Sequence, residues 1–535
     1  MPFVTINFTS PADSVNSLQA DSLQSRSAGR NKFDRKHLVG VVLIAASCSA
    51  ALLLLGINSE ISRSFPYFFL FPWILLLFAV LVVPSAILFR QGKFSFANPL
   101  VYATWSYFFP AFVMGGITLS IGWSQPYFLN YIQDAPSNLP WTIVLIILGY
   151  SGLTTGYFLP VGSAAGRVIG NYFTISSSTP VSYFNLPGIL LVLLGMVNSA
   201  IALALGVIGY QASREITPYD GLIFLSTLFW LEGGFILWYV VFKSSKVTVK
   251  LSLVIGFLVT TSLLKALFSG NRGNLLQSLI VIMLAFVLSG RALRVKQAMI
   301  GGFLFAFLLM AGMVYGTTFR NVRGNETGGG IATYTDNIFE TLTRVMDLSS
   351  EDAVEFGLTS LAERIDTVSS LAVVVSNYEE LAPYEESYGL NDNIRKDFIT
   401  SFVPRILWND KPVASDSRSY GELYFDLGGN AFAMTPIGDL LRNFGIPGVF
   451  GGMLLLGILL RSMFRALIED REVNTARATL YFMLLVSISY EGFYGLILPY
   501  FFKIGIAALL GVLIVTFLAA RLHRSASTAL AEARG

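Results

Sequence analysis

The segment 401–412, SFVPRILWNDKP, brings an arginine, a tryptophan and a lysine together between two prolines. The guanidinium group of Arg405 suits phosphate oxygens because its planar fork binds them bidentately and keeps its proton. Lys411 adds a second cation. Trp408 has two interpretations: it is an anchor at a membrane interface, or its flat apolar face stacks on a sugar ring. Together these side chains predict contact with a phosphorylated sugar.

Carboxylates follow directly, in VASDSRSYGELY at 413–424. Asp416 and Glu422 could each take a proton from an attacking hydroxyl group, the work of a general base. Arg418 stands between them as a further cation. We therefore take Asp416, Glu422 and Arg405 as the candidate catalytic residues, and the other three side chains as candidates for binding substrate.

Three further arginines stand at the ends of apolar runs, Arg272 in FSGNRGNLL and the pair Arg320 and Arg323 in TTFRNVRGNETGGG. Gly270 and Gly273 let the backbone around Arg272 approach a ligand closely. The spacing of three puts the other two arginines on one face of a helix. The alternatives are a solvated arginine in a plain turn and an ordinary pair of snorkelling side chains.

Charged residues also enter the last apolar runs, in TPIGDLLRNFGIPG and SYEGFYG. Asp439 and Arg442, three residues apart, either bind a ligand or form a purely structural ion pair. The glycines and prolines around them predict irregular backbone lining a cavity, where such backbone is tolerated at membrane depth. Glu491 requires a cationic partner inside the bundle, and Arg442 is the one we expect.

The elements that carry these residues are membrane-spanning helices. The 535 residues are 54% hydrophobic and 13% charged, whereas a soluble domain is about a quarter charged. A span needs about 20 apolar residues, and helices satisfy the backbone inside lipid. We predict an all-α polytopic membrane protein with about twelve spans, the tenth of which could begin as a re-entrant segment. They lie near 38–56, 66–89, 97–118, 140–162, 185–210, 219–243, 249–268, 274–290, 296–317, 434–460, 474–496 and 499–520.

The distribution of basic residues orients the spans. Lysine and arginine gather before the first span and in alternate loops, whereas the loop at 119–139 has neither, and cationic loops stay in the cytoplasm. Both termini are therefore predicted to be cytoplasmic and the long segment 318–433 to lie outside. The organisation is a tail, nine spans, the large outer loop, three spans and a second tail, at 1–37, 38–317, 318–433, 434–520 and 521–535.

The large outer loop is predicted to contain amphipathic helices over the bundle mouth. Apolar residues recur at helical spacing in 351–376 and again in 336–348. TGGGI and the GGN at 428–430 read as flexible joints between such elements.

Several classes of site are excluded by composition. Cys48 is the single cysteine, so no disulfide or cysteine-based metal site forms within one chain. His37 and His523 lie at predicted cytoplasmic ends and leave no outside histidine. A net charge of +3 implies no nucleic-acid partner. We expect no cofactor and no resident metal.

Five segments thus bring arginines and carboxylates to one predicted face, which suits a lipid pyrophosphate: the anion needs cations and the tail needs the bilayer. On the multi-span layout, the large late loop and the motifs SGNRGNLL, VPRILWNDKP and GDLLRNFGIPG, the chain resembles the Wzy-type oligosaccharide repeat-unit polymerases, or O-antigen polymerases. The resemblance covers about 250–500.

The resemblance implies a GT-C-like, multi-span glycosyltransferase of the bacterial cytoplasmic membrane, with its site on the outer side. Such enzymes join undecaprenyl-pyrophosphate-linked oligosaccharides, one as donor and one as acceptor. Essential outside arginines would map onto Arg272 and the arginines of the large loop. A chain-length regulator and a flippase are the protein partners it allows.

Two alternatives stay open. The first is an O-antigen ligase-like or other lipid-sugar glycosyltransferase, which the missing outside histidine disfavours. The second is a transporter or flippase of lipid-linked oligosaccharide, for which matched broken helices in both halves are expected and no internal repeat is visible in the sequence.

Overall fold

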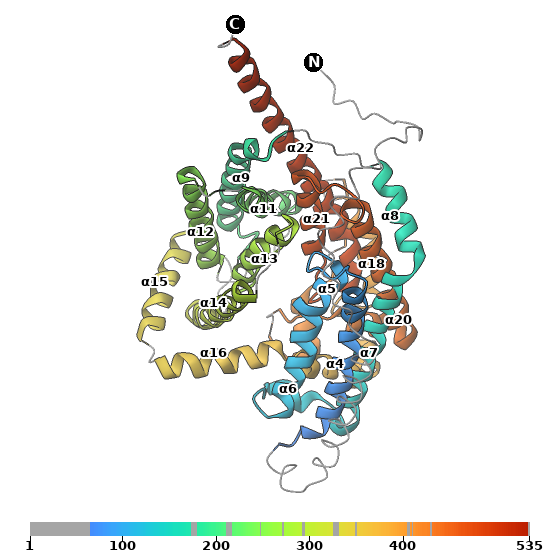
Figure 1. Ribbon diagram of the computed structural model, residues 1–535. Coiled ribbons are helices and arrows are strands. Elements are labelled where there is room, and N and C mark those ends of the chain that lie inside the picture. The colour runs from blue at the N-terminus through green and yellow to red at the C-terminus, as the bar shows by residue number, and fades with distance from the viewer. Residues whose placement is uncertain are drawn as a thin grey trace.

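The computed structural model describes residues 65–172, 179–209, 217–244, 246, 248–269, 272–291, 295–324, 331–347, 350–403, 407–408, 410–412, 414–428 and 431–532. The described part of the protein is 81% helix and contains no strand (Figure 1). The elements are η1 (Phe68–Leu70), α4 (Phe71–Arg90), α5 (Pro99–Ala103), η2 (Thr104–Met114), α6 (Gly115–Ser120), η3 (Tyr127–Tyr131), α7 (Ala135–Phe158), α8 (Pro160–Tyr172), η4 (Val181–Phe184), α9 (Asn185–Ala204), α10 (Asp220–Thr227), α11 (Phe229–Lys243), α12 (Val249–Ser269), α13 (Arg272–Leu288), α14 (Val295–Arg323), α15 (Ile331–Asp347), α16 (Ser350–Ile365), α17 (Thr367–Leu381), η5 (Ala382–Tyr384), α18 (Asn393–Ser401), α19 (Ser417–Phe425), α20 (Pro436–Leu467), α21 (Thr475–Ser487) and α22 (Tyr494–Glu532).

Within the described ranges, nine helical stretches are long and apolar enough to cross a membrane. Two shorter apolar helices, Leu276–Leu288 and Thr475–Ser487, lie where the eighth and eleventh spans are predicted. The predicted first span, 38–56, lies outside the described residues. The all-helical, multi-pass membrane class is therefore confirmed, whereas the total of twelve spans stays a prediction.

The contact between α7 and α20 depends on glycines that let two backbones touch. A Cβ atom at Gly156 would overlap the carbonyl oxygen of Leu454, and one at Gly457 would overlap that of Leu153. The Ser462 hydroxyl, one turn further along α20, donates a 3.1 Å hydrogen bond to the carbonyl oxygen of Gly162 on α8. In lipid, such close approach supplies the packing that hydrophobic burial supplies in water.

α20 reverses direction at Gly445, whose φ of 66° and ψ of −164° are not helical. Side-chain atoms of Ile437 and Val449 both lie within 3.3 Å of a Cβ built at Gly149. In a straight helix these two residues would be about 18 Å apart along the axis. The chain therefore forms a helical hairpin, in agreement with the re-entrant segment that the sequence favours for the start of the tenth span.

The predicted outer loop is largely helical, as expected from its periodicity, but it is not one surface layer. α16 runs across from α14 and α15 to α6 (Figure 1). The predicted helix 351–376 breaks at Asp366, which caps α17 by accepting hydrogen bonds from the Ser369 amide (3.0 Å) and the Ser124 hydroxyl (2.7 Å). The residues 368–375 are all buried, so α17 is a core helix and its predicted surface position is wrong. The side of the membrane stays a prediction, and both glycine joints lie mostly outside the described residues.

Gly156→Ala should destabilise the protein by about 1–3 kcal/mol, because the new methyl group must push α7 and α20 apart. Gly451→Ala on α20 is the matched control: a Cβ there has nothing within 4 Å, and alanine favours a helix over glycine by up to about 1 kcal/mol. The midpoint of thermal unfolding in detergent measures both. Equal midpoints for Gly156→Ala and the wild type would contradict the glycine contact.

Candidate functional site

Arg442 sits at the centre of a buried polar cluster near the re-entrant turn. Its Nε lies 2.5 Å from Oε1 of Glu385 and its Nη1 3.5 Å from Oδ1 of Asp439. Its Nη2 donates a 3.1 Å hydrogen bond to the carbonyl oxygen of Leu390. The side chains of Arg442 and Asp439 are 1% and 0% exposed. Each nitrogen of the guanidinium group thus has a protein partner. These contacts favour the purely structural role of the ion pair over the binding of a ligand.

Asp439 joins three elements through its two carboxylate oxygens. Oδ1 accepts a 3.0 Å hydrogen bond from Nδ2 of Asn393 on α18, and Oδ2 accepts one of 2.8 Å from the backbone amide of Tyr494. The second bond provides an acceptor for an N–H group at the start of α22, as the side chain of an N-cap residue does. We interpret Asp439 and Arg442 as the clamp that holds α18, α20 and α22 together.

Glu491 does not meet Arg442, so that expected pairing is wrong. It forms an ion pair with Arg364 of α16, and both side chains are more than 40% exposed. Arg442 is unavailable because Glu385 occupies it, and Glu385 also accepts a 2.8 Å hydrogen bond from the Tyr424 hydroxyl. Sequence patterns did not predict a role for Glu385, because its partners Tyr424 and Arg442 lie 39 and 57 residues away along the chain.

A second buried carboxylate, Asp397 of α18, has an unused oxygen. Oδ1 accepts a 3.0 Å hydrogen bond from the backbone amide of Ser415, whereas Oδ2 has no hydrogen-bond partner in the described part of the chain. Asp397 is 0% exposed. Burial raises the pKa of this carboxyl group more than Ser415 and Lys396 lower it. Such a group is suited to accept a proton near neutral pH.

Lys396 of α18 and Lys503 of α22 both interact electrostatically with Asp397. Lys503 of α22 interacts electrostatically with both Asp397 and Lys411. The Lys411 ammonium group donates a 2.9 Å hydrogen bond to the carbonyl oxygen of Val403, so the segment after α18 folds over itself. The rings of Phe402 and Phe502, 5.7 Å apart, press the same segment against α22. We call Asp397, Lys411 and Lys503 the α18–α22 corner.

The α18–α22 corner has the electrostatics of an anion site with a base. The ammonium groups of Lys411 and Lys503 repel each other, and an anion bound beside them would relieve the repulsion. Trp408 belongs to the same segment and is 37% exposed, which leaves part of its ring accessible. Phe502 and Ile506, next to Lys503 on α22, are 46% and 62% exposed, so the corner borders an apolar surface.

The structure places the other catalytic candidates as follows. Arg405 lies outside the described residues. Asp416 is the N-cap of α19, where its Oδ1 accepts a 3.0 Å hydrogen bond from the backbone amide of Arg418. Glu422 is exposed on α19. Asp416 thus has a local structural task, while its neighbour Ser415 reaches Asp397.

The arginines at the ends of the spans are in separate places. Arg272 begins α13, and its side chain lies outside the described part. Arg320 and Arg323 stand in the last turn of α14, as the spacing of three predicts. The Arg323 guanidinium, 4% exposed, lies 4.3 Å from the centre of the Tyr334 ring of α15. This cation–π contact helps to hold α15 against the end of α14.

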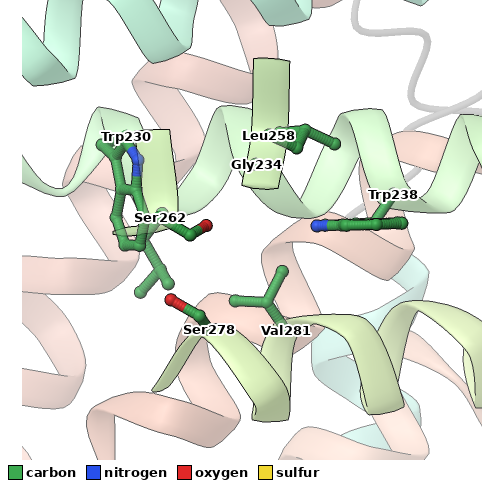
Figure 2. A pocket seen from close by; sticks show the side chains of 8 residues that line it. Trp230, Gly234, Trp238, Leu258, Ser262, Ser278 and Val281 are labelled. Carbon is green, nitrogen blue, oxygen red and sulfur yellow. The ribbon is translucent and has the colours of Figure 1, made fainter. Parts of the chain in front are cut away.

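A small cavity lies elsewhere, between α11, α12 and α13. Trp230 and Trp238 border it, and the hydroxyl groups of Ser262 and Ser278 face it (Figure 2). The Lys265 ammonium group lies 3.9 Å from the centre of the Trp230 ring. No cluster of three or more histidine, cysteine, aspartate or glutamate side chains that could hold a metal ion occurs among the residues the structure describes.

Sequence reasoning missed Asp397 and Lys503. Lys503 had a visible signal, a cation inside the apolar run of the last span, in YFFKIG. Asp397 had none, because its burial arises from the fold: a Cβ at Gly495 of α22 would lie 3.2 Å from the Cβ of Asp397.

The family model described as Domain of unknown function (DUF8712) matches residues 195–467, from α9 to the end of α20. The match covers slightly more than half of the chain, which therefore belongs to this family. It includes Asp397, Glu385 and Arg442 but ends before α22 and Lys503. No curated protein and no solved structure matches the chain.

Arg442→Met should destabilise the protein by about 3–5 kcal/mol, since it leaves two buried carboxylates without a cation. Adding Glu385→Gln should recover part of the loss, because one stranded charge is removed. Arg344→Ala is the control, since its pair with Glu340 is exposed and should contribute at most about 1 kcal/mol. Unfolding in detergent measures the three variants. A loss for Arg442→Met no larger than that of Arg344→Ala would refute the clamp.

Proposed function

We propose that this protein polymerises oligosaccharide units linked to undecaprenyl pyrophosphate, on the outer face of a bacterial cytoplasmic membrane. The resemblance to the Wzy-type polymerases supplies the reaction. The observation that carries the site is the α18–α22 corner, where a buried carboxylate with an unused oxygen interacts electrostatically with Lys503, and Lys503 in turn with Lys411. The corner adjoins exposed apolar side chains of α22, which a lipid tail could contact.

In the proposed reaction, a hydroxyl oxygen of the acceptor sugar attacks the anomeric carbon of the donor. The new glycosidic bond forms as the bond from that carbon to the pyrophosphate oxygen breaks, and the bond's electron pair leaves with the lipid pyrophosphate. Asp397 takes the hydroxyl proton. Lys411 and Lys503 stabilise the negative charge that grows on the leaving group.

Other residues keep supporting parts in this proposal. Trp408 offers its exposed ring to a sugar. Arg405 and Arg272 retain the pyrophosphate-binding role that the resemblance implies. Arg405 is close to Lys411 in sequence, and Arg272 is the first residue of α13. Asp416 and Glu422 are the alternative bases. The pair Asp439 and Arg442 holds α18 and α22 in register, so its contribution is to position Asp397 and Lys503.

The deciding experiment incubates purified protein in nanodiscs with a lipid-pyrophosphate-linked oligosaccharide, without nucleotide sugar, and separates the products by length. The wild type should give a ladder. Asp397→Asn should slow it by about 10²–10⁴-fold, the usual worth of a general base, and Lys503→Met should slow it too. Glu340→Gln, on the exposed face of α15, is the control and should leave the ladder unchanged. Unfolding midpoints of all variants show whether each is folded.

The pH profile provides a second readout. The base acts when ionised, so the wild-type rate should fall as pH drops through the raised pKa of Asp397. Asp397→Asn should lose that limb of the profile. Loss of the ladder in Asp416→Asn or Glu422→Gln alone would move the base to α19. A single addition would indicate a ligase-like transferase. Movement of the intact lipid-linked unit across the bilayer, measured with the same protein reconstituted into closed vesicles, would indicate a transporter.

A further inference from the structure

Glu232 is a lone carboxylate in the middle of a membrane span. It belongs to the apolar run FWLEGGFILWYVVF and lies near the centre of the 24-residue stretch Asp220–Lys243. Its side chain is 1% exposed. An ionisable group at this depth is costly and is retained where it has a task.

The carboxyl group of Glu232 is enclosed by the contact between α11 and α22, which lie side by side (Figure 1). A Cβ atom at Gly511 of α22 would overlap both carboxylate oxygens, so only glycine leaves room for them. Neither oxygen has a hydrogen-bond partner in the described part of the chain. The carboxyl group therefore faces the backbone of α22 at a buried helix–helix contact.

No cation whose side chain the structure describes donates a hydrogen bond to Glu232, although several lie on the elements packed against α11. Their titratable and charged residues, with those of α11 itself, are Tyr183 on η4, Asp220 on α10, Tyr239 and Lys243 on α11, Lys250 and Lys265 on α12, Arg272 on α13, Arg477 and Tyr481 on α21, and Tyr494, Tyr500, Lys503, Arg521, His523, Arg524 and Glu532 on α22; α9 has none.

The nearest cations by position lie away from this contact. Lys503 is eight residues before Gly511 and Arg521 ten residues after it, about 12 Å and 15 Å along a helix. Lys265 lies over the Trp230 ring, and residues two apart on a helix point to nearly opposite sides. The cavity beside α11 is lined by Trp230, Gly234 and Trp238 and does not include Glu232 (Figure 2).

We infer that Glu232 is a proton-binding site in the membrane: it carries a proton whenever α11 and α22 pack as they do here, and it releases that proton only when α22 separates and water enters. A neutral carboxyl group can be buried without a counter-ion, whereas a carboxylate cannot. α22 also carries Lys503, and Asp439 holds its first turn. A movement of α22 that accompanies proton release at Glu232 would therefore also move Lys503 and change the α18–α22 corner. The inference does not depend on the proposed glycosyl transfer.

The first test uses a membrane-soluble carbodiimide on the protein in nanodiscs at pH 8. A protonated carboxyl group adds across one C=N bond, its proton going to nitrogen and its oxygen to carbon, and the adduct rearranges to a stable N-acylurea. Mass spectrometry should find the label on Glu232 and lose it in Glu232→Gln. Asp439 is the internal control, because it is equally buried but held by Arg442, and it should stay unlabelled.

The second test covers the case in which the reagent fails to reach the site. Above the ordinary glutamate pKa of about 4.3, the unfolded chain gives up the proton that the folded protein must keep. Raising the pH should therefore disfavour folding of the wild type relative to Glu232→Gln, by up to tenfold in the folding equilibrium constant per pH unit. A difference between the two proteins that is constant with pH, or labelling that disappears near pH 5, would overturn the inference.

Discussion

The buried ion pair of Arg442 is the constraint on which the packing of the loop helices against α20 and α22 depends. One guanidinium group meets Glu385 before α18, the carbonyl oxygen of Leu390 and Asp439 on the re-entrant turn of α20. Asp439 in turn satisfies the first amide of α22. A charge at this depth is expensive unless every partner is present, so the loop helices and the last span can only be assembled together. The α18–α22 corner inherits its geometry from that assembly.

The contact of α20 with α7 and α8 is held by a different means. α7 and α8 lie along α20 with glycines at the contact, and the carbonyl groups of one helix touch the Cα atoms of the other. Lipid tails are as apolar as leucine, so apolar surface alone does not select one packing of two spans. Backbone contact does select one, because it tolerates no added methyl group. α20 carries both this glycine contact and the polar cluster around Arg442, so the close packing of α20 on α7 and α8 fixes the position of that cluster.

The sequence predicted what is local. Apolar runs of membrane length fall within a few residues of the spans, since hydrophobicity over about 20 residues is a property of the run itself. The polar start of the tenth span, with its glycines and prolines, indicated irregular backbone there, and the structure has a helical hairpin at Gly445. Partners were beyond reach: Glu385 meets a residue 57 positions away, and Arg364 rather than Arg442 meets Glu491 across 127 positions. The break at Asp366 was hidden because both halves of 351–376 have helical periodicity.

The charges inside this protein fall into three arrangements that differ in what they permit. Asp439 and Arg442 neutralise each other and have no capacity left for a ligand. Glu232 has no partner among the described residues, so a proton is the only species small enough to neutralise it beside Gly511. The α18–α22 corner is the intermediate case, with a carboxylate oxygen unused and two cations nearby. Of these three arrangements in the described part of the chain, the third borders exposed apolar side chains of α22, as the proposed chemistry on a lipid-borne anion requires.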